Sequence, residues 1–578
     1  MTTTEERVEQ HRTRAAPRQG ADPWWGRLTL AGLAVGTLWR LGQWWSTPSL
    51  WLDEASIANN ILERSYAGLA EPLVYEQGAP VGWLWIERTM THLFGDGEAV
   101  LRLWPFLAGV ATVFVAWALA RRLLGPRATA AYVAMVALWP PLVQYTGELK
   151  QYSTDTLASV LIILLAVRVQ RGERRARLHL AIAGSVLLWV SIPAVICLAA
   201  VGVVLGVDDL RRRDRIALRA DVAIAAAWAV TLAVLWVVAL SDLSSSVIVN
   251  GWANGYAPAL TRPAAWLQFL RRETLGLFGV PESALRYAMG MLMVVGAWRL
   301  VRRVPKRFAL LASVLVLALV ASQLKRYPYI ADRPSLYLLP IWLLLVASAI
   351  PEPLGRRDDA VAVDPRSARP VGSGEGASEA DPNATFAGSG SRGAGVGRAG
   401  ERRVAALGTV VVALVVVSSW ALTTRGQWWM VNPTAKRHDA RALLRDLAEV
   451  DHATTPIYLY RFSGTSYHYY DRHLDLPRPQ GAFRLADADR KDGSTSRISE
   501  CKGPISFEGA AGIWVVYTFP DPLFPPKFLK QLDIIRSLGT VRNALYEYGA
   551  VAFEFAPPPD PAVLCRISND LEGIRSPG

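Results

Sequence analysis

The feature that most constrains this chain is its series of long apolar runs. Most of them have roughly 17 to 25 residues, enough to cross about 30 Å of hydrocarbon as helices that satisfy their own backbone polar groups. We place eleven spans near residues 28–46, 100–120, 128–146, 153–169, 178–190, 193–207, 220–240, 286–301, 308–323, 334–350 and 404–421. The two that flank Pro193 are short, so one kinked helix is an alternative there. A chain that is 52% hydrophobic and 19% charged over 578 residues is too apolar for a soluble globular protein. The sequence predicts a polytopic α-helical membrane protein.

The formal net charge of +13 comes from arginines gathered in short connections between the runs. The clusters lie at residues 121–127, 168–177, 211–219 and 299–307, and a basic tail covers residues 1–27. If eleven spans are counted, all of these clusters fall on one side of the membrane. The positive-inside rule assigns that side to the cytoplasm. The basicity therefore sets topology and predicts no nucleic-acid partner.

This topology requires that residues 79–94 do not cross the membrane. We interpret this segment, which carries Glu87, Arg88 and His92, as an interfacial helix in a first outer loop over residues 47–99. The first apolar run is broken by Arg40 and is not followed by a small-residue cleavage site. It is therefore predicted to be a retained anchor rather than a secretion signal.

The remainder of the chain divides by composition. Residues 28–350 form the main transmembrane domain, and residues 351–403, rich in Gly, Ser, Ala and Pro, are predicted to be a disordered cytoplasmic linker. Residues 404–421 form the last transmembrane helix. Residues 422–578 alternate strand-like runs with helix-like runs and predict an extracytoplasmic α/β domain. Within it, "TSYHYYDRH" reads as an edge strand with buried tyrosines or as an aromatic surface that binds sugar.

Three cysteines give little further constraint. Cys197 lies in a span and is interpreted as a small apolar residue. Cys501 and Cys565 both lie in the C-terminal region, outside the membrane on this topology, where a disulfide is allowed. The sequence leaves that pairing open.

Charged residues at the outer ends of the runs are the candidates for function, because charge in or near the bilayer is costly and needs a reason. They form three groups: Asp53 and Glu54; Glu148, Lys150, Tyr152 and Asp155; and Lys325, Arg326, Asp332 and Arg333, interleaved with Tyr327, Tyr329 and Tyr337. The third group breaks the positive-inside pattern and would suit an anionic headgroup at the membrane surface. The structural alternative is that Asp332 pairs with one of its arginine neighbours and that all are snorkelling side chains.

These motifs in order, "WLDEA", "YEQGAP", "EAVLRLWPFLAGV", "RRLLGPRATAA" and "GELKQYSTDTLASVL", resemble the GT-C class of glycosyltransferases. These enzymes use lipid-phosphate sugars, and the class includes protein O-mannosyltransferases and the aminoarabinose transferases that modify lipid A. The resemblance covers roughly residues 28–350. It implies a multi-pass protein of the bacterial plasma membrane with its active site on the extracytoplasmic face.

The resemblance also implies roles for particular positions. Asp53 matches the catalytic acidic residue of the first loop, Glu54 its neighbour, and Asp155 the second acidic position. Lys325, Arg326 and Arg333 sit where the late outer loop approaches the donor phosphate. We add Glu148, Lys150, Tyr152 and Tyr329 as candidates for substrate binding. One departure from the aminoarabinose transferases is Ala79 in "QGAP", where those enzymes carry a lysine before the proline.

The residue types fit this chemistry without the resemblance. Polyprenyl phosphate is a good leaving group, so an enzyme needs a carboxylate to deprotonate an acceptor hydroxyl and cations to neutralise developing phosphate charge. A divalent cation between Asp53, Glu54 and Asp155 is chemically allowed, although no distinctive spacing supports it. The competing classes are a lipid or glycan transporter or flippase, with charges along a path at mid-membrane, and a non-catalytic envelope-assembly protein.

Overall fold

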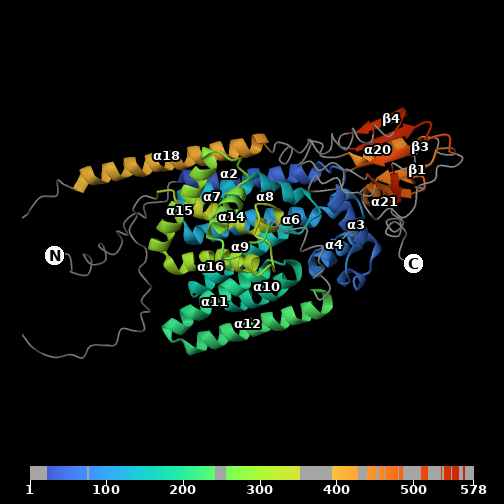
Figure 1. Cartoon of the computed structure of the whole chain (residues 1–578). Helices are drawn as coiled ribbons and strands as arrows, with labels where there is room; N and C mark the ends of the chain where they lie inside the picture. Colours follow the sequence, from blue (N-terminus) through green and yellow to red (C-terminus); the bar gives the residue numbers. More distant parts are fainter. Residues whose placement is uncertain are drawn as a thin grey trace, which may run out of the picture.

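The computed structural model describes residues 23–74, 77–240, 255–351, 394–426, 439–450, 455–460, 463–479, 481–485, 510–518, 536, 539–547, 550–558 and 564–566. Its larger part is helical and its smaller part is a mixed α/β domain near the C-terminus (Figure 1). The helices of the larger part are α2 (Pro23–Trp45), α3 (Leu52–Glu63), η1 (Gly68–Ala70), α4 (Val81–Phe94), α5 (Glu98–Leu101), α6 (Leu103–Leu123), α7 (Pro126–Leu138), α8 (Pro140–Gln144), η3 (Tyr145–Gly147), α9 (Tyr152–Gln170), α10 (Ala176–Val190), α11 (Ala194–Arg212), α12 (Arg215–Leu235), η4 (Trp236–Leu240), α14 (Pro263–Gly276), α15 (Ala284–Arg303), α16 (Pro305–Gln323), η6 (Arg333–Leu338), α17 (Leu339–Ser348) and α18 (Ala394–Gly426).

The helical part has the dimensions of a membrane domain. Among the described residues, six helical segments are long and apolar enough to cross a bilayer: Glu98–Leu123, Tyr152–Gln170, Arg215–Ala239, Ala284–Arg303, Pro305–Gln323 and Ala406–Arg425. Two shorter apolar segments are Ala176–Val190 and Arg333–Ser348. The predicted class, a polytopic helical membrane protein with a C-terminal α/β domain, is confirmed. The count of eleven spans stays a prediction.

Burial separates the centre of this domain from its rim. The apolar window of α9 is 83% buried, whereas that of α12 is 11% buried, so α9 is central and α12 presents most of its surface to lipid. Figure 1 shows α12 and α18 at opposite edges of the domain. Close helix packing depends locally on glycine: a Cβ at Gly296 of α15 would stand 1.7 Å from the backbone oxygen of Leu345 in α17.

The arginine-rich connections meet at one end of the domain. Arg122, in the last turn of α6, and Arg168 of α9 both pair with Glu173, at 3.3 and 2.7 Å. Lys306 at the start of α16 pairs with Asp208 of α11 at 2.6 Å. Connections that are far apart in the sequence therefore share one face of the membrane domain, as the charge pattern predicts.

The segments around Pro193 are two helices rather than one kinked helix. Arg177, near the start of α10, pairs with Asp209, near the end of α11, at 2.6 Å. The chain therefore reverses at residues 191–193, and α10 and α11 form an antiparallel pair. The end of α10 is also held to α4, because a Cβ at Gly82 would stand 2.7 Å from the backbone oxygen of Trp189.

Arg40 of α2 is a fully buried cation whose partners are backbone carbonyls. Its guanidinium donates to the oxygens of Val136 at 3.0 Å, Ala137 at 2.5 Å and Leu142 at 3.3 Å. Pro140 and Pro141 begin α8 and cannot donate to the carbonyls at the end of α7. Arg40 therefore satisfies carbonyls that the break between α7 and α8 leaves free, and it stands at the negative end of a helix.

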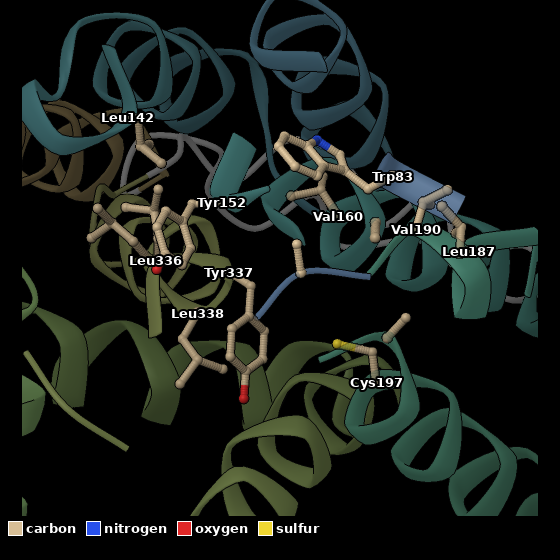
Figure 2. Close-up of a cluster of buried hydrophobic side chains, with 14 of the residues drawn as sticks. Trp83, Leu142, Tyr152, Val160, Leu187, Val190, Cys197, Leu336, Tyr337 and Leu338 are labelled. Atoms are coloured by element: carbon tan, nitrogen blue, oxygen red, sulfur yellow. The ribbon is translucent and has the colours of Figure 1, made fainter. Parts of the chain in front are cut away.

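Helix α4, which we predict to be interfacial, is anchored by an aromatic side chain. Figure 2 shows Trp83 among Val160 of α9 and Leu187 and Val190 of α10, all within the main buried cluster. Because Trp83 is fully buried, α4 is fixed to the central helix rather than lying loosely on the surface.

The C-terminal domain is a mixed sheet with two described helices. The strands are β1 (Ile457–Tyr460), β2 (Gly481–Leu485), β3 (Ile513–Tyr517), β4 (Val541–Glu547), β5 (Ala550–Phe555) and β6 (Leu564–Arg566), in the order β4-β5-β3-β1-β2-β6. β1 runs parallel to β2 and β3, and the remaining pairs are antiparallel. The helices are α20 (Ala440–Ala448) and α21 (Ser463–Leu474). The α/β prediction for this region is confirmed.

Two local predictions are wrong. "TSYHYYDRH" lies in helix α21 and not in an edge strand, although Tyr467, Tyr469 and Tyr470 are buried as expected. Tyrosine favours strands, but this preference is weak and the packing of the helix on its neighbours overrides it. The predicted linker also ends early, because α18 already begins at Ala394, and the Ala, Glu and Arg residues ahead of the apolar run are good helix formers.

The cysteine predictions are tested only in part. Cys197 of α11 is a buried free thiol, as expected of an apolar residue in a span. Cys501 lies outside the described residues, and Cys565 lies in β6. A bond between the last two stays a prediction.

Candidate active site

Asp53 is the second residue of α3, and its carboxylate lies between two cations. The Nη1 atom of Arg333 donates to Oδ2 of Asp53 at 2.7 Å, and Nζ of Lys150 lies 3.7 Å from the same oxygen. The N-cap of α3 is Trp51, whose N–H donates to Glu54, so Asp53 does not cap the helix. Its side chain is about one-fifth exposed, with a relative exposure of 21%. A charged group that is paired and still accessible can meet a ligand.

Packing between α9 and η6 brings the two cations together. Lys150 lies two residues before α9 begins, and Arg333 is the first residue of η6. The two elements are in contact, and Figure 2 shows Tyr152 of α9 beside Leu336 of η6. Asp332 caps η6 by accepting the N–H of Arg333 at 2.7 Å. The guanidinium of Arg333 also lies 5.3 Å from the ring centre of Trp51, next to α3.

The electrostatics of this group favour an ionised carboxylate. Burial by itself would raise the pKa of Asp53. Lys150 and Arg333 together lower it by more than burial raises it, so the net shift is downward. Burial lowers the pKa of Lys150, and Asp53 opposes that effect. Asp53 is therefore negative at neutral pH, and its charge is compensated by two cations.

Glu54 has a different role from its neighbour. It is 1% exposed and accepts from Nε and Nη2 of Arg102 at 2.9 and 2.7 Å. It also accepts the N–H of Leu149 at 2.7 Å and that of Trp51 at 3.3 Å. Both oxygens of Glu54 accept hydrogen bonds from protein groups. Glu54 therefore holds the start of α3 in place, and its carboxylate does not face the reacting groups.

Asp155 lies in the first turn of α9, buried at 3% exposure, and its Oδ1 atom has no hydrogen-bond partner in the described part of the chain. Asp53, Glu54 and Asp155 do not converge. Among the described residues there is no group of three or more His, Cys, Asp or Glu that could hold a metal ion. The predicted cation site between these carboxylates does not fit this arrangement, and we derive no step through a metal.

The remaining predicted site residues fall into two sets, one close to Asp53 and one distant from it. Tyr152 is buried and packs edge-on against Tyr145, close to Lys150, while Glu148 accepts from Gln144 at 2.8 Å. Tyr329 is buried and hydrogen-bonded to Thr274 at 2.6 Å, away from Asp53. Lys325 and Arg326 are exposed just after α16, and among the described residues the cations that pair with Asp53 are Lys150 and Arg333. Of the late-loop cations, only Arg333 reaches the acidic residue.

A largely apolar groove lies next to the segment 77–80, which Lys150 contacts. It is lined by side chains of η1, α4, α10, α11 and α12, among them Leu69, Leu84, Leu188, Trp189, Val195 and Leu232. Ala79 and Pro80 form part of its wall, and Lys150 donates to Gln77 at 2.9 Å, just before them. The segment 77–80 therefore joins the charged group to a groove beside the lipid-facing helix α12.

The family model described as dolichyl-phosphate-mannose-protein mannosyltransferase matches residues 78–243. The resemblance predicted from the sequence is confirmed. The matched segment includes Lys150 and Asp155 but neither Asp53 nor Arg333. No curated protein matches this sequence.

Several solved structures are similar at low identity. ArnT from Cupriavidus metallidurans in the apo state matches with 14% identity and a TM-score of 0.47, over 93% of this chain and 98% of its own. The same protein bound to undecaprenyl phosphate matches with 14% identity and a TM-score of 0.44, over the same 93% and 98%. The archaeal oligosaccharyltransferase AglB from Archaeoglobus fulgidus, in complex with an inhibitory peptide and a dolichol-phosphate, matches with 10% identity and a TM-score of 0.41, over 96% of this chain and 77% of its own. Because these TM-scores are below 0.5, neither the site nor its chemistry is inferred from them.

Sequence reasoning missed Arg102 and Gln77. Arg102 opens the apolar run "RLWPFLAGV", and an arginine at the outer end of a span was a detectable signal. Gln77 is neutral and carries no such signal. It was found only because Lys150 bonds to it.

Proposed function

We propose that this protein is an integral-membrane glycosyltransferase that moves a sugar from a polyprenyl-phosphate donor to a hydroxyl of an envelope glycan, glycolipid or protein. The observation that carries the proposal is the carboxylate of Asp53 held between Lys150 and Arg333 beside an apolar groove. A lipid-linked anionic donor has two parts, a charged headgroup and an apolar chain. The charged group and the groove suit these two parts.

The two cations are suited to the phosphate of the donor. Arg333 offers a planar, two-pronged set of donors, and Lys150 a compact positive charge. Both lie in a largely buried setting, at 22% and 5% exposure, where their attraction for a phosphate is stronger than in water. As the bond between sugar and phosphate breaks, negative charge develops on the phosphate, and fixed cations stabilise it.

Donor binding also changes the environment of Asp53. In the structure, Lys150 and Arg333 hold its pKa below the ordinary value, which makes the carboxylate a weak base. A phosphate placed against the same two cations would neutralise part of their charge, so the pKa of Asp53 would rise. Asp53 would therefore become a better acceptor for the hydroxyl proton only when the donor is present. Attack by the hydroxyl opposite the leaving phosphate inverts the anomeric centre.

The groove is suited to the polyprenyl chain. Its lining is largely apolar and includes residues of α12, a helix whose apolar window is only 11% buried and therefore faces lipid. A chain of isoprene units could enter there from the bilayer without crossing a polar surface. We assign the active site to the extracytoplasmic face of a bacterial plasma membrane, because the charged group lies at the opposite end of α9 from the arginine connections.

The domain organisation follows from this assignment. We propose that residues 28–350 carry catalysis, that residues 351–393 connect on the cytoplasmic side, and that the domain after α18 is extracytoplasmic. The transporter alternative has less support, because Asp53, Lys150 and Arg333 gather at one end of α9 rather than along a path through the membrane.

The test is Asp53→Asn, assayed with a panel of radiolabelled polyprenyl-phosphate sugars and envelope acceptors. Asparagine keeps the shape of the side chain but cannot take a proton, so we expect turnover to fall about a hundredfold or more while donor binding persists. The matched control is Asp96→Asn, which changes an exposed carboxylate on the same face and should leave turnover unchanged. Near-normal turnover of Asp53→Asn would exclude Asp53 as the base and leave Asp155 as the candidate.

A further inference from the structure

The C-terminal domain is in direct contact with α3, the helix that carries the candidate catalytic residue Asp53. Helix α21 packs on α3, and Figure 1 places the sheet domain at the end of the membrane domain where α3 and α4 lie. The contact includes the segment that leads into α3, only a few residues before Asp53. What the C-terminal domain does to this segment is therefore relevant to the site.

Tyr470 of α21 is the centre of this contact. Its hydroxyl accepts the backbone N–H of Leu50 at 2.8 Å and donates to Oε1 of Glu98 at 2.5 Å. Tyr470 is 2% exposed, and Leu50 is fully buried. Because water cannot reach this place, the tyrosine hydroxyl is the only described group that satisfies both the N–H and the carboxylate oxygen.

Neighbouring bonds hold the same segment from both sides. From the C-terminal domain, Asp439 lies 3.2 Å from the hydroxyl of Ser49, and Arg441 pairs with Glu98. From the membrane domain, Arg102 donates to the backbone oxygen of Pro48 at 2.6 Å. The entry to α3 is therefore clamped between the two domains.

The far end of α3 is held by the same helix of the C-terminal domain. Asn59 donates to the backbone oxygen of Thr465 at 3.0 Å, and Glu63 pairs with both His468 and Arg472. Helix α21 thus follows α3 over most of its length. A displacement of α21 would move α3 as a unit, including Asp53.

We propose that Tyr470 is a positioning residue: through the Leu50 N–H it sets the place of α3, and with it the distance between Asp53 and the cations Lys150 and Arg333. The consequence for catalysis rests on the proposed function, whereas the positioning itself does not. Arg333 meets Asp53 at 2.7 Å, so a shift of about 1 Å at the start of α3 would break this bond.

The test compares Tyr470→Phe with the matched control Tyr467→Phe in the full-length protein. Both variants remove one hydroxyl from a buried tyrosine of α21, but the hydroxyl of Tyr467 bonds to Pro477 within its own domain. Hydrogen exchange is measured on peptides that cover residues 48–56 and, as a folding control, β1 and β3. We expect exchange in residues 48–56 to rise at least tenfold in Tyr470→Phe and to stay at the wild-type rate in Tyr467→Phe.

A second variant covers the case in which Tyr470→Phe unfolds the sheet. Ser49→Ala changes a residue of the membrane domain and removes the hydroxyl that donates to Asp439 and accepts the N–H of Arg441. It should also raise exchange in residues 48–56 while β1 and β3 keep their protection. Wild-type exchange of residues 48–56 in Tyr470→Phe, or an equal rise in Tyr467→Phe, would overturn the proposal. If Tyr470→Phe unfolds the sheet, wild-type exchange in Ser49→Ala would overturn it.

A kinetic arm connects position to turnover. With a polyprenyl-phosphate sugar that the wild type uses, Tyr470→Phe should lower kcat about tenfold and leave the KM for donor unchanged, because the cations still bind phosphate. A rise in KM with normal kcat would contradict the assignment. If the wild type transfers no sugar from any donor, the proposed function fails, and the exchange result still decides whether Tyr470 positions α3.

Discussion

Replacing Glu54 by glutamine should destabilise the protein strongly without altering any group that reacts. One oxygen of Glu54 accepts from Nε of Arg102 and from the Leu149 N–H; the other accepts from Nη2 of Arg102 and from the Trp51 N–H. A glutamine has one oxygen and one NH₂ group. In either orientation, its NH₂ would face one hydrogen-bond donor of Arg102 and one of the backbone.

The magnitude follows from these bonds. Losing one bond to a charged donor costs about 1.5 to 3 kcal/mol, and losing one neutral bond costs about 0.5 to 1.5 kcal/mol. The guanidinium of Arg102 would also remain in a site that is 1% exposed, without its counter-charge. The sum agrees with the range of about 3 to 5 kcal/mol for breaking one partner of a buried pair.

The assay is thermal unfolding of the purified protein in detergent, with Asp53→Asn as the matched control. The control also changes a carboxylate to an amide, one residue away, but Asp53 is about one-fifth exposed, whereas Glu54 is 1% exposed, so the loss of its charge should cost less. We expect Glu54→Gln to melt well below the wild type and Asp53→Asn to melt at a temperature between the two. If Glu54→Gln melts like the wild type and loses turnover, Glu54 is catalytic and our reasoning about the brace is wrong.

Two further predictions concern charge. Replacing Arg333 by alanine should weaken donor binding by about 1.5 to 3 kcal/mol, and Arg333→Lys should recover part of this loss. The measurement is a titration of each variant with the donor. Unchanged affinity in Arg333→Ala would show that Arg333 has a structural role. Burial raises the pKa of Glu63, but His468 and Arg472 lower it, and the net shift is downward. The ionised form therefore stabilises the fold above the unfolded pKa of about 4.3, and this stability is lost as pH falls through the lower folded value. From pH 7 to pH 3, the melting temperature of Glu63→Gln should fall less steeply than that of the wild type. Parallel curves of melting temperature against pH for the two proteins would show that the contact of Glu63 with His468 and Arg472 is not linked to protonation.

Sequence reasoning identified Asp53 and Arg333 separately but could not pair them. They are 280 positions apart, and no local pattern records which loop meets which. Only the packing of η6 on α9 decides that Arg333, rather than Lys325 or Arg326, points to the acidic residue. The catalytic roles of these residues stay predictions.

The assignment of Glu54 to the same site as Asp53 had a foreseeable difficulty. Adjacent residues on a helix point about 100° apart, so two neighbouring carboxylates rarely serve one site. The membrane domain was easier to predict, because hydrophobic length is a local property of the sequence. The short helix α21 was misread because its tyrosines suit strands, and only its burial against α3 specifies the helix.

The bonds of Arg40 have a consequence for the order in which the chain is made. The Gly36 oxygen belongs to α2 itself, but the other three carbonyl partners of Arg40 lie 96 to 102 residues further along, so they do not exist when α2 leaves the ribosome. An unpartnered arginine in a transmembrane helix costs about 2.5 to 3.5 kcal/mol near the bilayer centre, and less toward the interface. During synthesis, α2 therefore stays marginally stable in lipid until α7 and the start of α8 arrive. Helix α2 therefore depends for its place on two helices that are made after it.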